Sequence, residues 1–166
     1  MLKIIQVAEE HISNVRELFQ ENLISANLMI SHEFNISLDV NASLEQDIAT
    51  IQRFYPPSGR LLLAEYEGKI IGCAGLKKIS QNVGEVKRMY VRPEYRTKGI
   101  GRSLLQAIIT EARQIGYSKI RLDSAPFAKS AQSLYYSTGF QNIEPYPESE
   151  IPKEYHSRWV FMELVL

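Results

Sequence analysis

The segment from residue 84 to residue 123 constrains the fold of this chain more than any other. Residues 84–92 have the pattern of a strand, and a turn containing two glycines follows at 96–101. A helix comes next, with Gly116 suited to end it, because apolar residues recur at helical spacing: Ile100, Leu104, Leu105, Ile108, Ala112 and Ile115. Residues 119–123 form a second strand. This order predicts a right-handed crossover between parallel strands.

The rest of the chain predicts one α/β sheet with helices on both faces. Further strands are expected at 2–7, 61–66, 70–76, 140–144 and 158–165. Consecutive strands joined by short connections favour antiparallel pairing, so the sheet is expected to be mixed and mostly antiparallel. The sequence contains no repeat, linker or low-complexity tract, so we expect a single domain over residues 1–166.

Composition narrows the possible partners. Lys and Arg number 19 and Asp and Glu number 19, so no nucleic-acid or membrane-surface partner is expected. No apolar run approaches the roughly 20 residues that span a bilayer. The lone cysteine, Cys73, excludes an internal disulfide and fits a cytoplasmic location. No metal-ligand spacing is present, and a homodimer is compatible with the sequence.

The turn Arg96-x-x-Gly99-x-Gly101 lies between a strand and a helix. A helix start offers unpaired N–H groups and the positive end of the helix dipole, and glycine lets the backbone approach a phosphate closely. Lys98 and Arg102 add positive charge, so the turn fits a pyrophosphate. Taken alone, the pattern also fits an ordinary strand-to-helix turn. The spacing matches neither a P-loop nor a dinucleotide-binding fingerprint.

Three motifs in order resemble the GNAT superfamily of N-acetyltransferases. They are the strand 85–93, the turn 96–101, and the later Ala131-x-x-Leu134-Tyr135-x-x-x-Gly139-Phe140. The resemblance covers most of the chain, roughly from residue 60 to the end. It implies a GNAT-like sheet in which the central parallel strand pair splays, and it implies an enzyme that transfers an acetyl group from acetyl-CoA to an amine.

The resemblance also implies which residues bind acetyl-CoA. The backbone of the glycine turn and the start of its helix would hold the pyrophosphate, and the preceding strand would pair with the pantetheine arm and the acetyl carbonyl. The first group comprises Arg96, Thr97, Lys98, Gly99, Ile100, Gly101, Arg102 and Ser103, and the second comprises Met89, Tyr90 and Val91. One departure is Thr97, where many members of the family have glycine.

Two residues are candidates for catalysis. Tyr135 matches the tyrosine of the third motif, which implies that its hydroxyl protonates the leaving thiolate; simple aromatic packing is the alternative. Glu85 is the candidate base, acting through water. Carboxylates are rarely buried in a central strand, so its presence there indicates a specific role. A salt bridge from Glu85 to Lys87 or to a neighbouring strand is the alternative. Strand alternation would place both of them on one face with Met89 and Val91.

The acceptor side is less constrained. In the family it is built from the first two helices and the last two strands, which implicates Phe34 and Tyr155 as substrate-binding residues. The neutral charge favours a small-molecule amine that attacks directly in a ternary complex. Acetylation of a protein or peptide amine, or a catalytically silent acyl-CoA sensor, are the alternatives.

Overall fold

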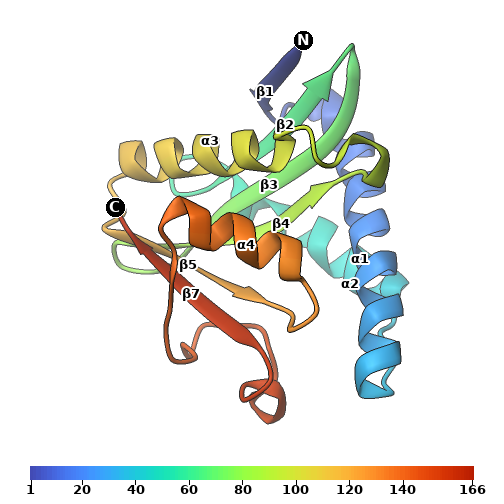
Figure 1. The fold of residues 1–166 in the computed structure, drawn as a ribbon. Coiled ribbons are helices and arrows are strands. Elements are labelled where there is room, and N and C mark those ends of the chain that lie inside the picture. The colour runs from blue at the N-terminus through green and yellow to red at the C-terminus, as the bar shows by residue number, and fades with distance from the viewer.

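The computed structural model describes residues 1–166 and contains a seven-stranded sheet in the order β1-β2-β3-β4-β5-β7-β6 (Figure 1). The strands are β1 (Leu2–Gln6), β2 (Arg60–Tyr66), β3 (Lys69–Ser80), β4 (Val83–Val91), β5 (Lys119–Ser124), β6 (Gln141–Asn142) and β7 (Val160–Val165). Every neighbouring pair is antiparallel except β4 and β5, which run parallel. The predicted mixed, mostly antiparallel sheet is therefore confirmed.

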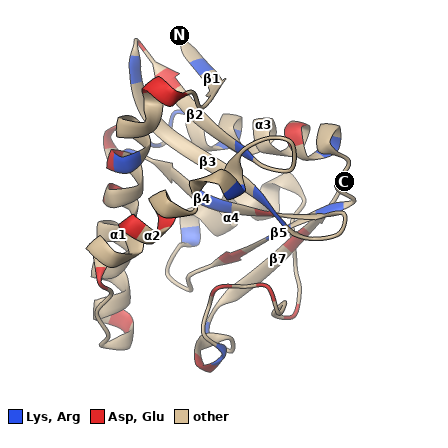
Figure 2. Ribbon diagram, turned by 180° about the vertical axis from the view of Figure 1, so that it is seen from behind, with Lys and Arg blue, Asp and Glu red and all other residues tan.

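Helices cover both faces of this sheet. α1 (Ile12–Phe34) and α2 (Val40–Ala49) pack on one face, and α3 (Ile100–Ile115) and α4 (Lys129–Thr138) on the other (Figures 1 and 2). Four short 3-10 turns complete the structure: η1 (Glu9–His11), η2 (Ile51–Phe54), η3 (Pro93–Tyr95) and η4 (Lys153–Tyr155). No helix is long and apolar enough to cross a membrane.

Local chemistry explains where the helices begin and end. The Asp39 carboxylate accepts a hydrogen bond of 3.0 Å from the N–H of Ala42, which caps the start of α2. Gly116 has φ 101°, a left-handed conformation that glycine adopts without a Cβ clash, and it ends α3 as predicted. α1 ends at Asn35, which is also left-handed. The end of α1 lies near the connection before β7, since Phe34 contacts Tyr155 there; Figure 1 shows α1 running down one side of the molecule.

Two separate hydrophobic cores hold the helices on the sheet. The larger one joins α3 and Tyr135 of α4 to the sheet, and its fully buried members include Leu104, Leu105 and Ile108. The smaller one joins α1 and α2 to the other face around Phe19. Both cores place β3 and β4 at the centre of the molecule, with side chains buried on each side.

β4 and β5 diverge soon after they meet. Their parallel pairing covers three residue pairs, ending at Glu85 opposite Arg121. Beyond that point β4 continues against β3 as far as Val91, and β5 continues against β7 as far as Ser124. Figure 1 shows the two strands separating, with α4 in front of the opening. A gap therefore opens within the sheet, in agreement with the splayed pair that the family resemblance implies.

A β-bulge at Arg88 corrects one prediction. Arg88 has φ 55°, and the register between β3 and β4 shifts there. The side chains of Lys87 and Arg88 both face the α2 side, where Glu150 contacts each of them. Met89 and Val91 instead pack in the α3 core. The predicted common face of Glu85, Lys87, Met89 and Val91 is wrong, because the extra residue reverses the alternation that follows it.

Candidate active site

The backbone of β4 forms one wall of the gap. The N–H of Arg92 donates to the carbonyl of Ile71 in β3 at 2.9 Å, so Arg92 and, by alternation, Tyr90 direct their backbone groups toward β3. Met89 and Val91 direct theirs into the gap. The Val91 carbonyl accepts a hydrogen bond of 2.8 Å from Nε of Arg96. The bulge therefore leaves two residues of β4 with polar backbone groups available to an extended ligand.

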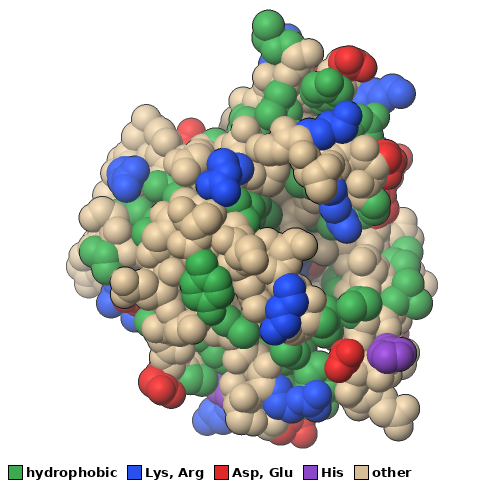
Figure 3. Space-filling model, viewed as in Figure 1, with side chains coloured by type: hydrophobic (Ala, Val, Ile, Leu, Met, Phe, Trp, Pro, Cys, Tyr) green, Lys and Arg blue, Asp and Glu red, His purple; other side chains and the backbone are tan.

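The glycine turn lies at one end of this gap. Thr97 and Gly99 have φ values of 66° and 78°, and α3 begins directly after them. No backbone N–H from Thr97 to Arg102 donates to a protein acceptor, and the helical ladder begins with Ser103 donating to Gly99 at 3.0 Å. These free donors, together with the helix dipole, make an anion site. Figure 3 shows Lys and Arg side chains around a hollow on this side of the molecule.

The three sequence motifs meet at Gly101. A Cβ built at this glycine would lie 3.5 Å from Leu134 of α4 and 3.6 Å from Met89 of β4. Arg102 also reaches α4, where its guanidinium donates to the Ser137 hydroxyl at 3.0 Å. The start of α3, the end of β4 and the middle of α4 thus form one continuous surface, although 45 residues separate Met89 from Leu134.

Tyr135 lies next to that surface. Its ring is buried in the α3 core, 5.7 Å from the ring of Phe140, so the packing role is present. Burial, with a smaller contribution from Asp123, raises the pKa of Tyr135 to about 12. The hydroxyl makes no hydrogen bond to the protein. It is therefore protonated at neutral pH and has no competing acceptor, as a proton donor requires.

Glu85 lies at the closed end of the gap, on the opposite face of the sheet. Its side chain is 0% exposed, and Oε2 accepts a hydrogen bond of 2.6 Å from the Tyr146 hydroxyl. Oε1 has no hydrogen-bond donor and lies 3.6 Å from Nζ of Lys77. Burial raises the pKa of Glu85, and the positive charge of Lys87 and the Tyr146 hydrogen bond offset this only in part. The salt bridge predicted as the alternative forms with Lys77 of the neighbouring strand β3.

The structure also brings together two residues predicted for the acceptor side. Phe34 at the end of α1 lies 5.4 Å from Tyr155 of η4, between ring centroids, and 5.3 Å from Trp159. The guanidinium of Arg158 stands 4.1 Å above the Phe34 ring. This aromatic contact links the far end of α1 to the loop before β7. Its role in acceptor binding stays a prediction.

Several contacts between charged residues near the gap were not predicted from the sequence. Lys87 of β4 lies 3.6 Å from Asp123 of β5, which joins the two strands beyond their last backbone pair. Arg88 forms two hydrogen bonds with Asp47 of α2, at 2.6 and 2.7 Å. Two consecutive cations in a central strand were the available signal, but strand alternation assigned them to opposite faces.

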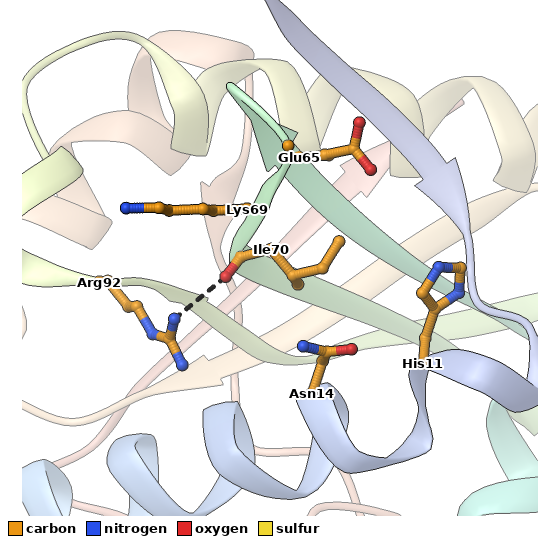
Figure 4. Close-up of a pocket in the computed structure, with 7 residues that line it drawn as sticks. His11, Asn14, Glu65, Lys69, Ile70 and Arg92 are labelled. Atoms are coloured by element: carbon orange, nitrogen blue, oxygen red, sulfur yellow. Dashed lines mark hydrogen bonds between the residues drawn. The ribbon is translucent and has the colours of Figure 1, made fainter.

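A surface hollow also lies outside this gap. It has a volume of about 450 Å³ and lies between the start of α1 and the β2–β3 turn, lined by His11, Asn14, Glu65, Gly68, Lys69, Ile70 and Arg92. Figure 4 shows Arg92 tied to the Ile70 carbonyl at its edge, a bond of 3.1 Å. None of the predicted site residues lines this hollow. No group of three His, Cys, Asp or Glu residues in the chain could hold a metal ion.

Comparison with known proteins gives one consistent family. The Acetyltransferase (GNAT) family pattern matches residues 12–140. An uncharacterized N-acetyltransferase of Schizosaccharomyces pombe is 35% identical over 76% of this chain and 78% of its own length. The IAA acetyltransferase of Azospirillum brasilense is 32% identical over 65% of this chain and 71% of its own. The PaiA N-acetyltransferase of Thermoplasma acidophilum, solved with coenzyme A, is 20% identical with a TM-score of 0.76, covering 100% of this chain and 99% of that one.

The raised pKa of Glu85 predicts how stability depends on pH. Because folded Glu85 binds its proton more tightly than the unfolded chain does, the stabilisation from protonation is complete at low pH and is lost as pH rises through the folded-state pKa. Glu85→Gln lacks this titration. Urea denaturation between about pH 4 and 8 should therefore show the wild type losing stability relative to Glu85→Gln as pH rises.

Glu45→Gln is the control of opposite sign. The hydrogen bond from Arg16 lowers the pKa of Glu45, so the wild type should gain stability over this variant as pH rises. A difference between wild type and Glu85→Gln that also grows in favour of the wild type with pH would contradict the assignment for Glu85.

Proposed function

Because this chain belongs to the Acetyltransferase (GNAT) family and is an N-acetyltransferase that uses acetyl-CoA, we propose that it acetylates the primary amine of a small molecule by direct attack in a ternary complex. The observation that carries the proposal is the gap between β4 and β5, with free N–H groups at one end and the Tyr135 hydroxyl beside it.

The glycine turn and β4 hold the donor in this proposal. The free N–H groups from Thr97 to Arg102, with Ser103 behind them, bind the pyrophosphate. Met89 and Val91 pair with the pantetheine arm through their backbone. Tyr90 contributes no backbone group to the gap, because its own point toward β3, and it acts as the spacer between the two. Acetyl-CoA supplies the activated acetyl thioester at the end of that arm.

The residues near the gap then have separate tasks. A backbone N–H of Met89 or Val91 stabilises the oxyanion that develops as the amine attacks. The Tyr135 hydroxyl donates its proton to the departing thiolate. An amine with a pKa of about 10.4 must first lose a proton, and Glu85 is the proposed acceptor of that proton. Because Glu85 is fully buried, the proton reaches it through an intermediary, and the Tyr146 hydroxyl at 2.6 Å is suitably placed.

An acceptor screen tests the function itself. Purified protein with acetyl-CoA is offered amino acids, polyamines, aminoglycosides and short peptides, and thiol release is followed with each. Turnover of one or more small amines is expected. A strong preference for peptides would contradict a small-molecule acceptor and favour a peptide amine. Binding of coenzyme A without turnover of any compound would favour a catalytically silent sensor.

Gly99→Val is expected to raise the Kd for coenzyme A by about tenfold or more, measured by calorimetry. Its side chain would enter the open space in front of the free N–H groups, where the phosphates must approach. Gly68→Val in the β2–β3 turn is a matched control, because Gly68 has the same φ of +78° and equally open surroundings. Equal weakening in both variants would trace the effect to backbone strain.

Tyr135→Phe is expected to lower kcat by roughly a hundredfold and leave the Kd for acetyl-CoA unchanged, because the ring still packs while the proton donor is lost. Tyr136→Phe is the control on the next residue, since Tyr136 is 46% exposed and its hydroxyl contacts Asn142. Steady-state kinetics and calorimetry make the comparison. An unchanged kcat in Tyr135→Phe would remove the acid role.

Glu85→Gln is expected to remove the acidic limb of the pH–rate profile. A protonated carboxyl accepts no further proton, so wild-type activity should rise with pH through the raised pKa of Glu85. The variant should show low activity with no such rise, measured as kcat/KM under conditions where both proteins are folded. If the acidic limb of the profile has the same position and height in the variant, Glu85 is not the base.

A further inference from the structure

A cluster of paired charges lies on the α2 side of the gap, and the proposed chemistry uses only one of its members. We call it the Glu150 cluster; it comprises the cations Arg53, Lys77, Lys87 and Arg88 and the carboxylates Asp47, Glu85, Asp123 and Glu150. Figure 2 shows basic segments of the central strands on the side of the sheet where α2, with its acidic segment, packs.

Glu150 is the centre of this cluster. Its carboxylate lies 2.9 Å from Arg53, 3.3 Å from Lys77, 3.6 Å from Lys87 and 3.8 Å from Arg88. Burial opposes its ionisation, but the four cations outweigh burial and lower the pKa of Glu150 to about 2. The side chain is therefore an anion at all physiological pH values. Its charge is already paired with four cations, so it is not free to attract a cationic amine.

Glu150 also differs from its partners in position. Its side chain is 41% exposed, whereas those of Lys87 and Lys77 are 7% and 12% exposed. The cations are carried by β3, β4 and η2, while Glu150 belongs to the connection between β6 and β7, where η4 is the only regular element. A carboxylate on a surface loop thus covers four cations that rigid elements hold beneath it.

The remaining carboxylates do not balance these cations. Asp47 is bonded twice to Arg88 and once to Arg53, and Asp123 is shared between Lys87 and the Ser149 hydroxyl. Burial raises the pKa of Glu85, which weakens its contribution of negative charge. If Glu150 moves away, four cations face three carboxylates. The carboxylate of a ligand could then bind at little cost in free energy, because its negative charge replaces that of Glu150.

The cluster lies where an acceptor would need it. Lys87 and Asp123 join β4 to β5 across the gap, and Arg88 immediately precedes Met89, whose backbone faces into the gap. We propose that the cations of the Glu150 cluster bind the carboxylate of the acceptor, which is a small amine bearing a carboxylate such as an amino acid, and that Glu150 occupies this position until the acceptor displaces it. This inference rests on the proposed function.

The first experiment compares amino acids with their primary amides, using thiol release from acetyl-CoA. The wild type is expected to favour each acid over its amide by about ten- to hundredfold in kcat/KM, the range for a hydrogen bond to a charged group. Absence of release with every amine would refute the proposed function. Release at equal rates with acid and amide would leave that function standing and overturn this inference.

Two variants locate the carboxylate site. Lys77→Gln is expected to reduce the preference for acid over amide by about tenfold. Lys78→Gln is the matched control, because Lys78 is the next residue of β3, is exposed, and forms no ion pair in the structure. A preference that survives unchanged in Lys77→Gln would overturn the assignment.

Glu150→Gln separates displacement from direct recognition of the amine. Without the competing charge, KM for the acid should fall severalfold while KM for the amide stays the same. If Glu150 instead binds the ammonium group, KM should rise for acid and amide alike, which would overturn the proposal.

A measurement without turnover completes the test. Malonate should raise the Tm of Glu150→Gln more than that of the wild type, and should not do so in the double variant Lys77→Gln/Glu150→Gln. Equal shifts in all three proteins would show that malonate acts elsewhere, and the proposal would fail.

Discussion

The short parallel pairing of β4 with β5 is the constraint on which the rest of this structure depends. Three residue pairs hold the two strands together, and each strand then follows a different antiparallel neighbour. Backbone groups that a continuous sheet would satisfy internally are left facing a gap. The start of α3 and the middle of α4 meet the end of β4 at this opening, so the free donors of the glycine turn border it and Tyr135 follows Leu134 beside it.

The bulge at Arg88 places the side chains before and after it on opposite faces of the sheet. Before it, Glu85 and Lys87 face the α2 side; after it, Met89 and Val91 face the α3 side. In the proposed arrangement, one strand provides polar backbone for the donor and charged side chains for the acceptor. A regular strand would have placed Arg88 in the apolar core beside Val86, where an unpaired guanidinium is costly. The paired hydrogen bonds with Asp47 show how that cost is avoided.

Buried charge is concentrated on one side of the gap. The α3 side holds the larger hydrophobic core, whereas the α2 side holds the Glu150 cluster. Such a network gives little net stability, because desolvation offsets most of the attraction between the charges. Its position at the sheet opening, and the exposed loop carboxylate at its centre, are better explained by binding than by stability.

Local sequence determined the elements of this protein and its donor site. The helical spacing of apolar residues defines α3, and Gly99 and Gly116 mark its two ends. The motif that contains Leu134 and Tyr135 falls on α4. The face on which each β4 side chain lies was decided only in the folded sheet, because the bulge arises from pairing with β3. The Glu150 cluster likewise joins residues from 47 to 150, and no local pattern encodes contacts over such separations.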